Sequence, residues 1–583
     1  MLEFLYRKTK KAIRGLDMLL TRNKYGYIDK LPEDFEYPEG GMYDLIYESC
    51  CKWPHSVALT YYNNDITYHE LARRIDRTAR ALKAIGVEKG DRVTVCMPNT
   101  PESVYMFYAI SEVGAVANMI HPLSSEKEIE EYVSRAESKV ILTIDIAYHK
   151  VENIIKNTPL EHVIVVSPAR SMDFLVTAIY HLTKGRKNHV KKNQVVTTWD
   201  RFLSGASKFV GNPHARVNAG DDAVILYSGG TTGKPKGVVL SNLNFNAQAI
   251  GAKYLVPELL RSRFSMLCFL PNFHAFGLGV CIHLPLFCGM RAVLIPQFSA
   301  KKFKSYIKKY RINILVGVPT VYDYFTKIKF GPSDLKRIKG VVSGGDMVGQ
   351  ALKTRLNDFL RAHGSKGMIH NGYGLTEAAG GMIFSPGTIA ERENVIGYPL
   401  PDSEVLILDP KTGREVNPGE DGEILLRGLT IMKEYLGDKA ETKNAFKEVN
   451  GKKYLRTGDI GYTDGSGAVY FRGRLKRMII TNGYNVYPSN VEEVTMKCEA
   501  VERCACIGVP DDLRGEIVKI YISVKPNASP RAAKKDLTHI YKKYLAKFET
   551  PRLIETIDTF PMTKLGKIDY NQLVEMSKKR KRR

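Results

Sequence analysis

Short apolar segments alternate with stretches of helical periodicity along most of this chain, and this alternation restricts its fold more than any other feature. Residues 92–97 and 223–226 have the length and apolar character of buried strands, whereas residues 71–85 and 103–113 repeat apolar side chains at helical spacing. Further strand-like runs occupy residues 266–270, 292–295, 312–318 and 338–342. Strands separated by helix-length segments are typical of doubly wound parallel sheets. We therefore predict an α/β fold with a large N-terminal domain built on such sheets.

The pattern changes after Gly397. Three short strand-like segments, residues 404–408, 423–427 and 468–471, lie between turns rich in Gly, Asp and Pro. We expect these strands to form a small antiparallel subdomain that closes the large domain.

A small, mobile α+β domain is expected at the C-terminus. Residues 491–498 and 534–544 have helical patterns, and residues 517–524 have the pattern of a strand. A chain of 583 residues also exceeds what one hydrophobic core usually supports. We place the boundary near the segment GRLK at residues 473–476, so that residues 1–474 form the large domain and residues 475–583 the small one.

The cysteines and the apolar segments indicate a cytoplasmic protein. None of the nine cysteines forms a C-x-x-C pair, and no cleavable signal peptide is visible. The longest stretch without Lys, Arg, Asp or Glu, residues 264–290, is interrupted by Pro271, Asn272 and Pro285. Because a membrane span needs about twenty consecutive apolar residues, we expect buried strands and helix ends there instead.

The net charge of +24 leaves three classes of partner open: nucleic acid, an anionic membrane and polyanionic small substrates. Residues 1–24 place leucines on one helical face among Arg and Lys, which resembles an interfacial amphipathic helix, and residues 174–182 precede a second basic run. Both segments could instead dock on the body of the protein, and the tail 578–583 is expected to be a solvated basic end. No RNA-recognition or helix-turn-helix pattern accompanies the basic residues, so we expect no nucleic acid, and peripheral membrane contact stays open.

A loop suited to phosphate follows the strand at residues 223–226. Residues 227–238 read YSGGTTGKPKGV, in which glycines allow close approach of backbone amides, and threonines and lysines add donors and positive charge. The segment is not a Walker-type loop, because Ser228 stands at the first glycine position and Pro235 follows Lys234 where Ser or Thr is required.

Four further sequence motifs restrict the kind of reaction that this chain could catalyse. The segment NGYGLTE at residues 371–377 offers an aromatic ring, a hydroxyl and a carboxylate, and LRTGD at residues 455–459 places one carboxylate on a tight turn. GRLKR at residues 473–477 supplies cations at the expected domain boundary, and PMTKLGK at residues 561–567 supplies a lysine on a glycine loop.

Together and in this order, these motifs resemble those of the adenylate-forming superfamily, which includes acyl-CoA synthetases, aryl-CoA ligases and nonribosomal adenylation domains. The resemblance runs from roughly Trp53 to Tyr570 and includes the opening segments ITYHEL at residues 66–71, GDRV at 90–93 and MPNTPE at 97–102. It implies ATP, Mg²⁺ and coenzyme A as cofactor and co-substrates, and a carboxylic acid as substrate.

The resemblance also implies roles for individual residues. The phosphate loop would hold the ATP β- and γ-phosphates through Ser228, Gly229, Gly230, Thr231, Thr232, Gly233, Lys234 and Lys236. The nucleoside would contact Tyr373, Asn371, Gly344 and Gly345 through adenine, and Asp459 and Arg474 through ribose. The catalytic set would be Thr376 at the α-phosphate, Glu377 as Mg²⁺ ligand, Lys567 at the α-phosphate and the acyl carboxylate, and His274 at the carboxylate pocket. His274 could instead be an ordinary core histidine. Lys476 would be the hinge about which the small domain turns between the two half-reactions.

The sequence departs from common family patterns in four places. Ile480 stands where many members have Lys, and Glu434 replaces a usual glycine. Asp346 and Met347 replace small residues, and Asp569 and Tyr570 stand where a basic residue is common. None of these changes removes a residue of the predicted catalytic set.

We predict an ATP-dependent acyl-CoA ligase acting on medium- to long-chain fatty acids. The chain-length part depends on the apolar run around His274, on general similarity to long-chain synthetases and on the amphipathic segments. An aryl-acid (coumarate-type) CoA ligase and a fatty acyl-AMP ligase that loads a carrier protein remain alternatives, as does a non-catalytic binding scaffold with a degenerate nucleotide site.

Overall fold

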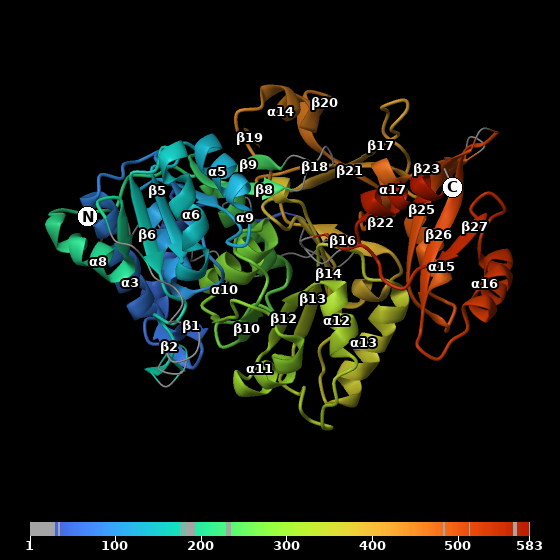
Figure 1. Ribbon diagram of the computed structural model, residues 1–583, viewed down its shortest axis with the longest axis horizontal. Helices are drawn as coiled ribbons and strands as arrows, with labels where there is room; N and C mark the ends of the chain where they lie inside the picture. Colours follow the sequence, from blue (N-terminus) through green and yellow to red (C-terminus); the bar gives the residue numbers. More distant parts are fainter. Residues whose placement is uncertain are drawn as a thin grey trace.

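The structure is a computed structural model that describes residues 30–32, 35–174, 176–177, 180, 190, 193–228, 235–481, 484–511, 513–563 and 568–581. In this part of the chain, the strands form three sheets (Figure 1). The predicted amphipathic segment 1–24, most of the segment 174–182 and the last two residues of the basic tail lie outside the described residues.

The first sheet has eight strands in a mostly parallel arrangement. Their order is β19 (Glu434–Tyr435), β9 (Lys236–Ser241), β8 (Asp222–Ser228), β4 (Val116–Met119), β3 (Arg92–Cys96), β5 (Val140–Ile144), β6 (His162–Val166) and β7 (Val196–Thr198). The strands from β8 to β7 pair in parallel, whereas β9 and β19 add antiparallel strands at one edge. Helices α3 (Tyr68–Ala84) and α4 (Pro101–Glu112) confirm the two predicted helices of this region.

The second sheet is the largest and is parallel only in part. Its parallel strands are β1 (Val57–Tyr61), β11 (Arg291–Leu294), β10 (Ser265–Cys268), β12 (Ile314–Gly317), β13 (Gly340–Ser343) and β14 (Ile369–Tyr373), with β2 (Asn64–Thr67) antiparallel at the edge. It continues through the antiparallel strands β15 (Ile383–Phe384), β16 (Val395–Pro399), β22 (Val469–Arg474), β21 (Lys452–Thr463), β18 (Gly422–Arg427), β17 (Glu404–Leu408) and β20 (Phe446–Val449). The predicted antiparallel strands therefore extend the parallel sheet rather than forming a sheet of their own.

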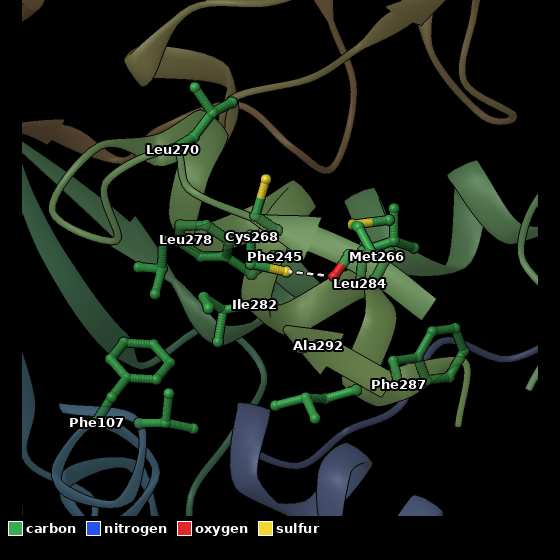
Figure 2. Packing of buried hydrophobic residues seen from close by; sticks show 14 of the residues in the cluster. Phe107, Phe245, Met266, Cys268, Leu270, Leu278, Ile282, Leu284, Phe287 and Ala292 are labelled. Carbon is green, nitrogen blue, oxygen red and sulfur yellow. Dashed lines mark hydrogen bonds between the residues drawn. The ribbon is translucent and has the colours of Figure 1, made fainter. Parts of the chain in front are cut away.

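The uncharged stretch 264–290 lies in the interior, as predicted. It contains β10, the π-helix η6 (Phe276–His283) and helix α10 (Leu284–Phe287), and Figure 2 shows Leu278 and Ile282 of η6 among buried hydrophobic residues of neighbouring elements. His283 is buried there, and its ring nitrogens contact the Tyr108 hydroxyl and the Asn246 amide oxygen at 3.1 and 3.0 Å. Burial lowers the pKa of His283 to about 3, so this histidine is a neutral core residue. No helix of the described residues is both long and apolar enough to cross a membrane.

The third sheet belongs to the C-terminal region and lies at one end of the molecule (Figure 1). It consists of β24 (Tyr484–Val486), β23 (Ile479–Thr481), β26 (Gly515–Val524), β25 (Val501–Asp511) and β27 (Leu553–Thr556), with helices α15 (Pro488–Thr495), α16 (Pro530–Tyr544) and α17 (Tyr570–Lys581). Val491, Ile520, Leu537 and Tyr541 belong to a core of its own. The single-turn helix η10 (Leu475–Arg477) connects the second sheet to the third.

Candidate active site

The two ends of the predicted phosphate loop lie opposite each other. Ser228, the last residue of β8, pairs with Lys236, the first residue of β9. The loop residues between them, Gly229, Gly230, Thr231, Thr232, Gly233 and Lys234, lie outside the described residues. The Lys236 ammonium forms an ion pair with Glu441 of helix α14 (Lys439–Ala445) and lies 4.8 Å from the centre of the Tyr435 ring. The Lys236 ammonium therefore lies at the start of β9, directly after the phosphate loop.

Tyr435 links Glu377 to this cation, because it contacts both side chains. The Tyr435 hydroxyl donates a hydrogen bond of 2.9 Å to Glu377 Oε1, and the backbone N–H of Met432 donates to the Glu377 carbonyl at 2.9 Å. Burial, followed by the Glu377 carboxylate, raises the pKa of Tyr435, which keeps the phenol a neutral donor. The structure thus brings together two predicted residues, Glu377 and Lys236, through two residues that the sequence analysis missed, Tyr435 and Glu441.

A second cluster combines Tyr373, Asp459 and Arg474. The Tyr373 hydroxyl donates a hydrogen bond of 2.7 Å to Asp459 Oδ2, and Arg474 Nε lies 3.0 Å from Asp459 Oδ1. Asp459 and Arg474 are register partners on β21 and β22. The Asp459 side chain is only 1% exposed whereas that of Arg474 is 51% exposed, so the cation covers a buried acceptor. Burial, followed by the Asp459 charge, raises the pKa of Tyr373.

The glycines and Asn371 lie at the same edge of the second sheet as this cluster. Gly344 follows β13 and Tyr373 ends β14, and the carboxyl ends of parallel neighbours meet at one edge, where open α/β sheets bind ligands. A Cβ atom on Gly344 would lie 2.8 Å from the Phe276 ring, and Gly345 has a φ of +75°, so both positions need glycine. The Asn371 amide nitrogen donates to the Val395 carbonyl at 2.7 Å, which fixes the orientation of this side chain.

His274 and Thr376 are carried by two segments in tight contact. His274 lies just before η6, and Thr376 begins the single-turn helix η8 (Thr376–Ala378). A Cβ atom on Gly380, just after η8, would lie 2.4 Å from the backbone carbonyl carbon of Ala275, beside His274. This close backbone approach brings the two predicted residues into neighbouring segments at the edge of the site.

The structure describes the residues on either side of the loop predicted to carry Lys567. Lys567 lies outside the described residues, but Met562 and Ile568 on either side of its segment form an isolated antiparallel bridge. Burial, followed by the Glu492 carboxylate, raises the pKa of Tyr570, the first residue of α17. Lys476 lies exposed in η10 between the second and third sheets.

The Glu377 carboxylate suits a magnesium ion whose other ligands come mainly from a bound substrate. No group of three or more His, Cys, Asp or Glu side chains in the described residues could hold a metal by itself. Glu377 contributes one carboxylate, of which Tyr435 occupies Oε1 as a donor. Mg²⁺ is usually bound by one or two carboxylates together with substrate phosphates and water, so Glu377 fits this cation once a nucleotide is present.

The chain belongs to the AMP-binding enzyme family. The family model for the AMP-binding enzyme matches residues 46–436, and the model for the AMP-binding enzyme C-terminal domain matches residues 490–567. The resemblance predicted from the motifs is thereby confirmed.

Relatives with similar sequences include CoA ligases and synthases. A long-chain-fatty-acid–CoA ligase of Bacillus subtilis is 29% identical over 559 residues, which cover 94% of this chain and 97% of the relative. A feruloyl-CoA synthase of an Amycolatopsis species is 29% identical over 518 residues, which cover 88% of this chain and 94% of the relative.

Solved structures share the fold. The anthranilate CoA ligase AuaEII in complex with anthranoyl-AMP superimposes with a TM-score of 0.78 at 25% identity, covering 92% of this chain and 97% of that one. ATP-bound MatB from Rhodopseudomonas palustris gives a TM-score of 0.79 at 24% identity, with 92% and 99% covered. The predicted α/β fold class is therefore confirmed.

Proposed function

We propose that this chain is an ATP-dependent acyl-CoA ligase that adenylates a medium- to long-chain fatty acid and transfers the acyl group to coenzyme A. The observation that carries this proposal is the buried Asp459 carboxylate, which Tyr373 and Arg474 orient at the ligand-binding edge of the second sheet. A carboxylate accepts two hydrogen bonds from a diol such as ribose. Family membership supports the nucleotide, and the long-chain relatives support the acid.

In this proposal the nucleoside lies against the carboxyl ends of β13 and β14. Asp459 accepts the ribose hydroxyl hydrogens with Arg474 beside it, and the Tyr373 ring stacks on adenine. Asn371 lies at the amino edge of the base, and Gly344 and Gly345 let the backbone approach its other face. The phosphates extend toward Ser228, Lys236 and the loop residues between them.

Glu377 would hold Mg²⁺ in this arrangement. The bound ion would neutralise charge on the phosphate oxygens during adenylation. Thr376 and Lys567 contact the α-phosphate, where charge develops in the transition state, and fixed donors there lower the barrier. His274 lines the entry of the acid.

The reaction proceeds in two half-reactions. The fatty acid carboxylate attacks the α-phosphorus of ATP, the bond to pyrophosphate breaks, and pyrophosphate leaves with an acyl-AMP mixed anhydride remaining. The CoA thiolate then attacks the acyl carbon, and AMP leaves with the bonding electrons. Because water would hydrolyse the mixed anhydride, the site must exclude it between the steps.

The small domain, residues 475–583, presents Lys567 for the first half-reaction and turns about Lys476 for the second. The position of η10 between two separate sheets supports this hinge. Its residues belong to neither sheet, so a rotation there would not break the strand pairing of either one. Domain closure by rotation at such a connector is a common device in enzymes.

Peripheral contact with an anionic membrane at the cytoplasmic face is part of the proposal. Fatty acids partition into membranes, and basic amphipathic segments bind anionic lipid. Deleting residues 1–24 is expected to lower sedimentation with anionic liposomes while adenylation of a water-soluble acid persists. Unchanged sedimentation would contradict membrane binding by this segment.

Acid-dependent exchange of labelled pyrophosphate into ATP, without coenzyme A, tests the first half-reaction. We expect medium- and long-chain fatty acids to support exchange and coumarate or ferulate to support much less. Exchange with the aromatic acids alone would favour the aryl-CoA ligase, which the feruloyl-CoA synthase relative keeps as a second candidate.

A further inference from the structure

One phenol lies between the two charged groups at the phosphate end of the candidate site. The Tyr435 hydroxyl is 2.9 Å from Glu377 Oε1, and the face of the same ring lies 4.8 Å from the Lys236 ammonium. Tyr435 is 8% exposed, so its ring is buried between these two groups. The hydrogen bond and the cation–π contact therefore use two different parts of one buried side chain.

The backbone around Tyr435 is fixed on both sides. Tyr435 pairs with Val238 in the two-residue strand β19, and its N–H donates to Thr442 Oγ1 at 2.9 Å. The next residue, Leu436, donates its N–H to the Gly237 carbonyl at 2.7 Å. Strand β9, which follows the phosphate loop, pairs with β19, which carries Tyr435. The position of the Tyr435 ring is therefore fixed relative to the start of β9.

Glu377 is tied to the same segment by its main chain. The Met432 N–H donates to the Glu377 carbonyl at 2.9 Å, three residues before Tyr435. Glu377 is thus bonded to the segment around β19 through its main-chain carbonyl and through its carboxylate. The orientation of the carboxylate therefore depends on the position of β19.

A phenol suits this place better than a cation would. A carboxylate offers about four lone-pair positions, and one neutral donor occupies one of them. The carboxylate therefore keeps its negative charge and most of its acceptor capacity for a metal ion, whereas a Lys or Arg in the same place would compete with that ion through its charge.

We propose that Tyr435 is a positioning residue that orients the Glu377 carboxylate toward magnesium bound to the ATP phosphates and holds Lys236 beside it. This inference rests on the proposed function. Tyr435 touches neither nucleotide nor acid in this account, and it acts through Glu377 and Lys236.

Binding of ATP in the absence of acid and coenzyme A tests the inference without turnover. The Tyr435→Phe variant keeps the ring over Lys236 and removes the hydroxyl, and we expect Kd for Mg·ATP, measured by calorimetry, to rise about tenfold, as the loss of a hydrogen bond to a charged group predicts. Kd for ATP measured in EDTA should change less than about twofold, because the hydroxyl acts through the metal ligand. The Tyr435→Leu variant also removes the cation–π contact and should weaken metal-free ATP binding.

Tyr454 provides a matched control. Its hydroxyl donates to Glu404 Oε2 at 2.8 Å and it is 6% exposed, but it lies on β21 in the antiparallel part of the second sheet. The Tyr454→Phe variant should bind Mg·ATP like the wild type. Equal losses in the Tyr435→Phe and Tyr454→Phe variants would overturn the inference.

The Glu377→Gln background separates positioning from a general structural effect. There, adding Tyr435→Phe should leave Kd for Mg·ATP unchanged, since the group on which the phenol acts is already altered. A Tyr435→Phe variant that binds Mg·ATP within twofold of the wild type, or that loses the same factor with and without metal, would overturn this inference alone. A wild-type chain that binds no ATP would overturn the proposed function and this inference with it.

Discussion

Glu112 makes the stability of the large domain depend on pH. It ends helix α4, is 3% exposed, and its Oε2 atom has no hydrogen-bond partner in the described part of the chain. Burial, followed by the negative charges of Asp76 and Asp44, raises the pKa of Glu112 from 4.5 to about 8. The folded protein therefore binds this proton more tightly than the unfolded chain does, and the stability that the neutral carboxyl provides is lost as the pH rises from about 4.5 to about 8.

The cost can be worked out from this difference in pKa. At about 1.36 kcal/mol for each tenfold change in proton affinity, the raised pKa of Glu112 lowers the free energy of unfolding by about 3 kcal/mol at pH 7, where the unfolded chain has released the proton that the folded protein still holds. The loss reaches about 5 kcal/mol well above pH 8, where the buried carboxyl is ionised as well. The Glu112→Gln variant keeps a neutral side chain of the same shape at every pH. It should match the wild type within about 1 kcal/mol at pH 5 and exceed it by about 3–5 kcal/mol at pH 8.

Urea unfolding followed by tryptophan fluorescence measures this difference. The two tryptophans of the chain, Trp53 and Trp199, both lie in the large domain, so the signal reports on that domain alone. Other titrating groups are common to both proteins and cancel in the comparison. The Glu88→Gln variant, altered at a side chain that is 71% exposed, is the control and should follow the wild type at every pH. A Glu112→Gln variant that is no more stable than the wild type at pH 8 would contradict a raised pKa of Glu112 in the folded protein.

Two further predictions concern the proposed mechanism. The Asp459→Ala variant should raise KM for ATP about 10- to 100-fold through loss of the ribose acceptor. The Asp421→Ala variant, which removes a more exposed carboxylate paired with Arg472, should not raise it. An unchanged KM in the Asp459 variant would reject the ribose role. The Lys567→Ala variant should slow adenylation by about two to three orders of magnitude and spare thioester formation from supplied acyl-AMP, and equal loss in both half-reactions would contradict the turning of the small domain.

The fold could be predicted largely from local patterns. Strand-like runs and helical spacing report on burial, so the predicted helix 71–85 matches α3 closely, and α3 begins earlier because the Thr67 side chain accepts a hydrogen bond from the Glu70 N–H as a cap. The antiparallel strands were also predicted, but their joining to the parallel sheet through β15 was not, since strand pairing between distant segments leaves no local pattern.

Some residues of the candidate site could be predicted from sequence motifs, and others could be found only from the structure. Tyr373, Asp459 and Arg474 stand in glycine-rich motifs, and the structure brings these three together. Tyr435 and Glu441 carry no such motif, because a tyrosine in a two-residue strand looks like any apolar residue until the partner across the fold is known. The burial of Glu112 could not be predicted from the sequence either. A glutamate at a helix end is usually solvated, and here tertiary packing buries it.

The most direct test of the proposed function uses the purified chain with oleate, ATP, Mg²⁺ and coenzyme A. The products are identified by mass spectrometry beside those of reactions with shorter fatty acids and with coumarate. We expect oleoyl-CoA together with AMP and pyrophosphate, and no thioester when ATP is left out. Acyl-AMP without any CoA thioester would indicate a carrier-protein acceptor, and absence of turnover with every acid would contradict the central claim that this site is a working acyl-CoA ligase.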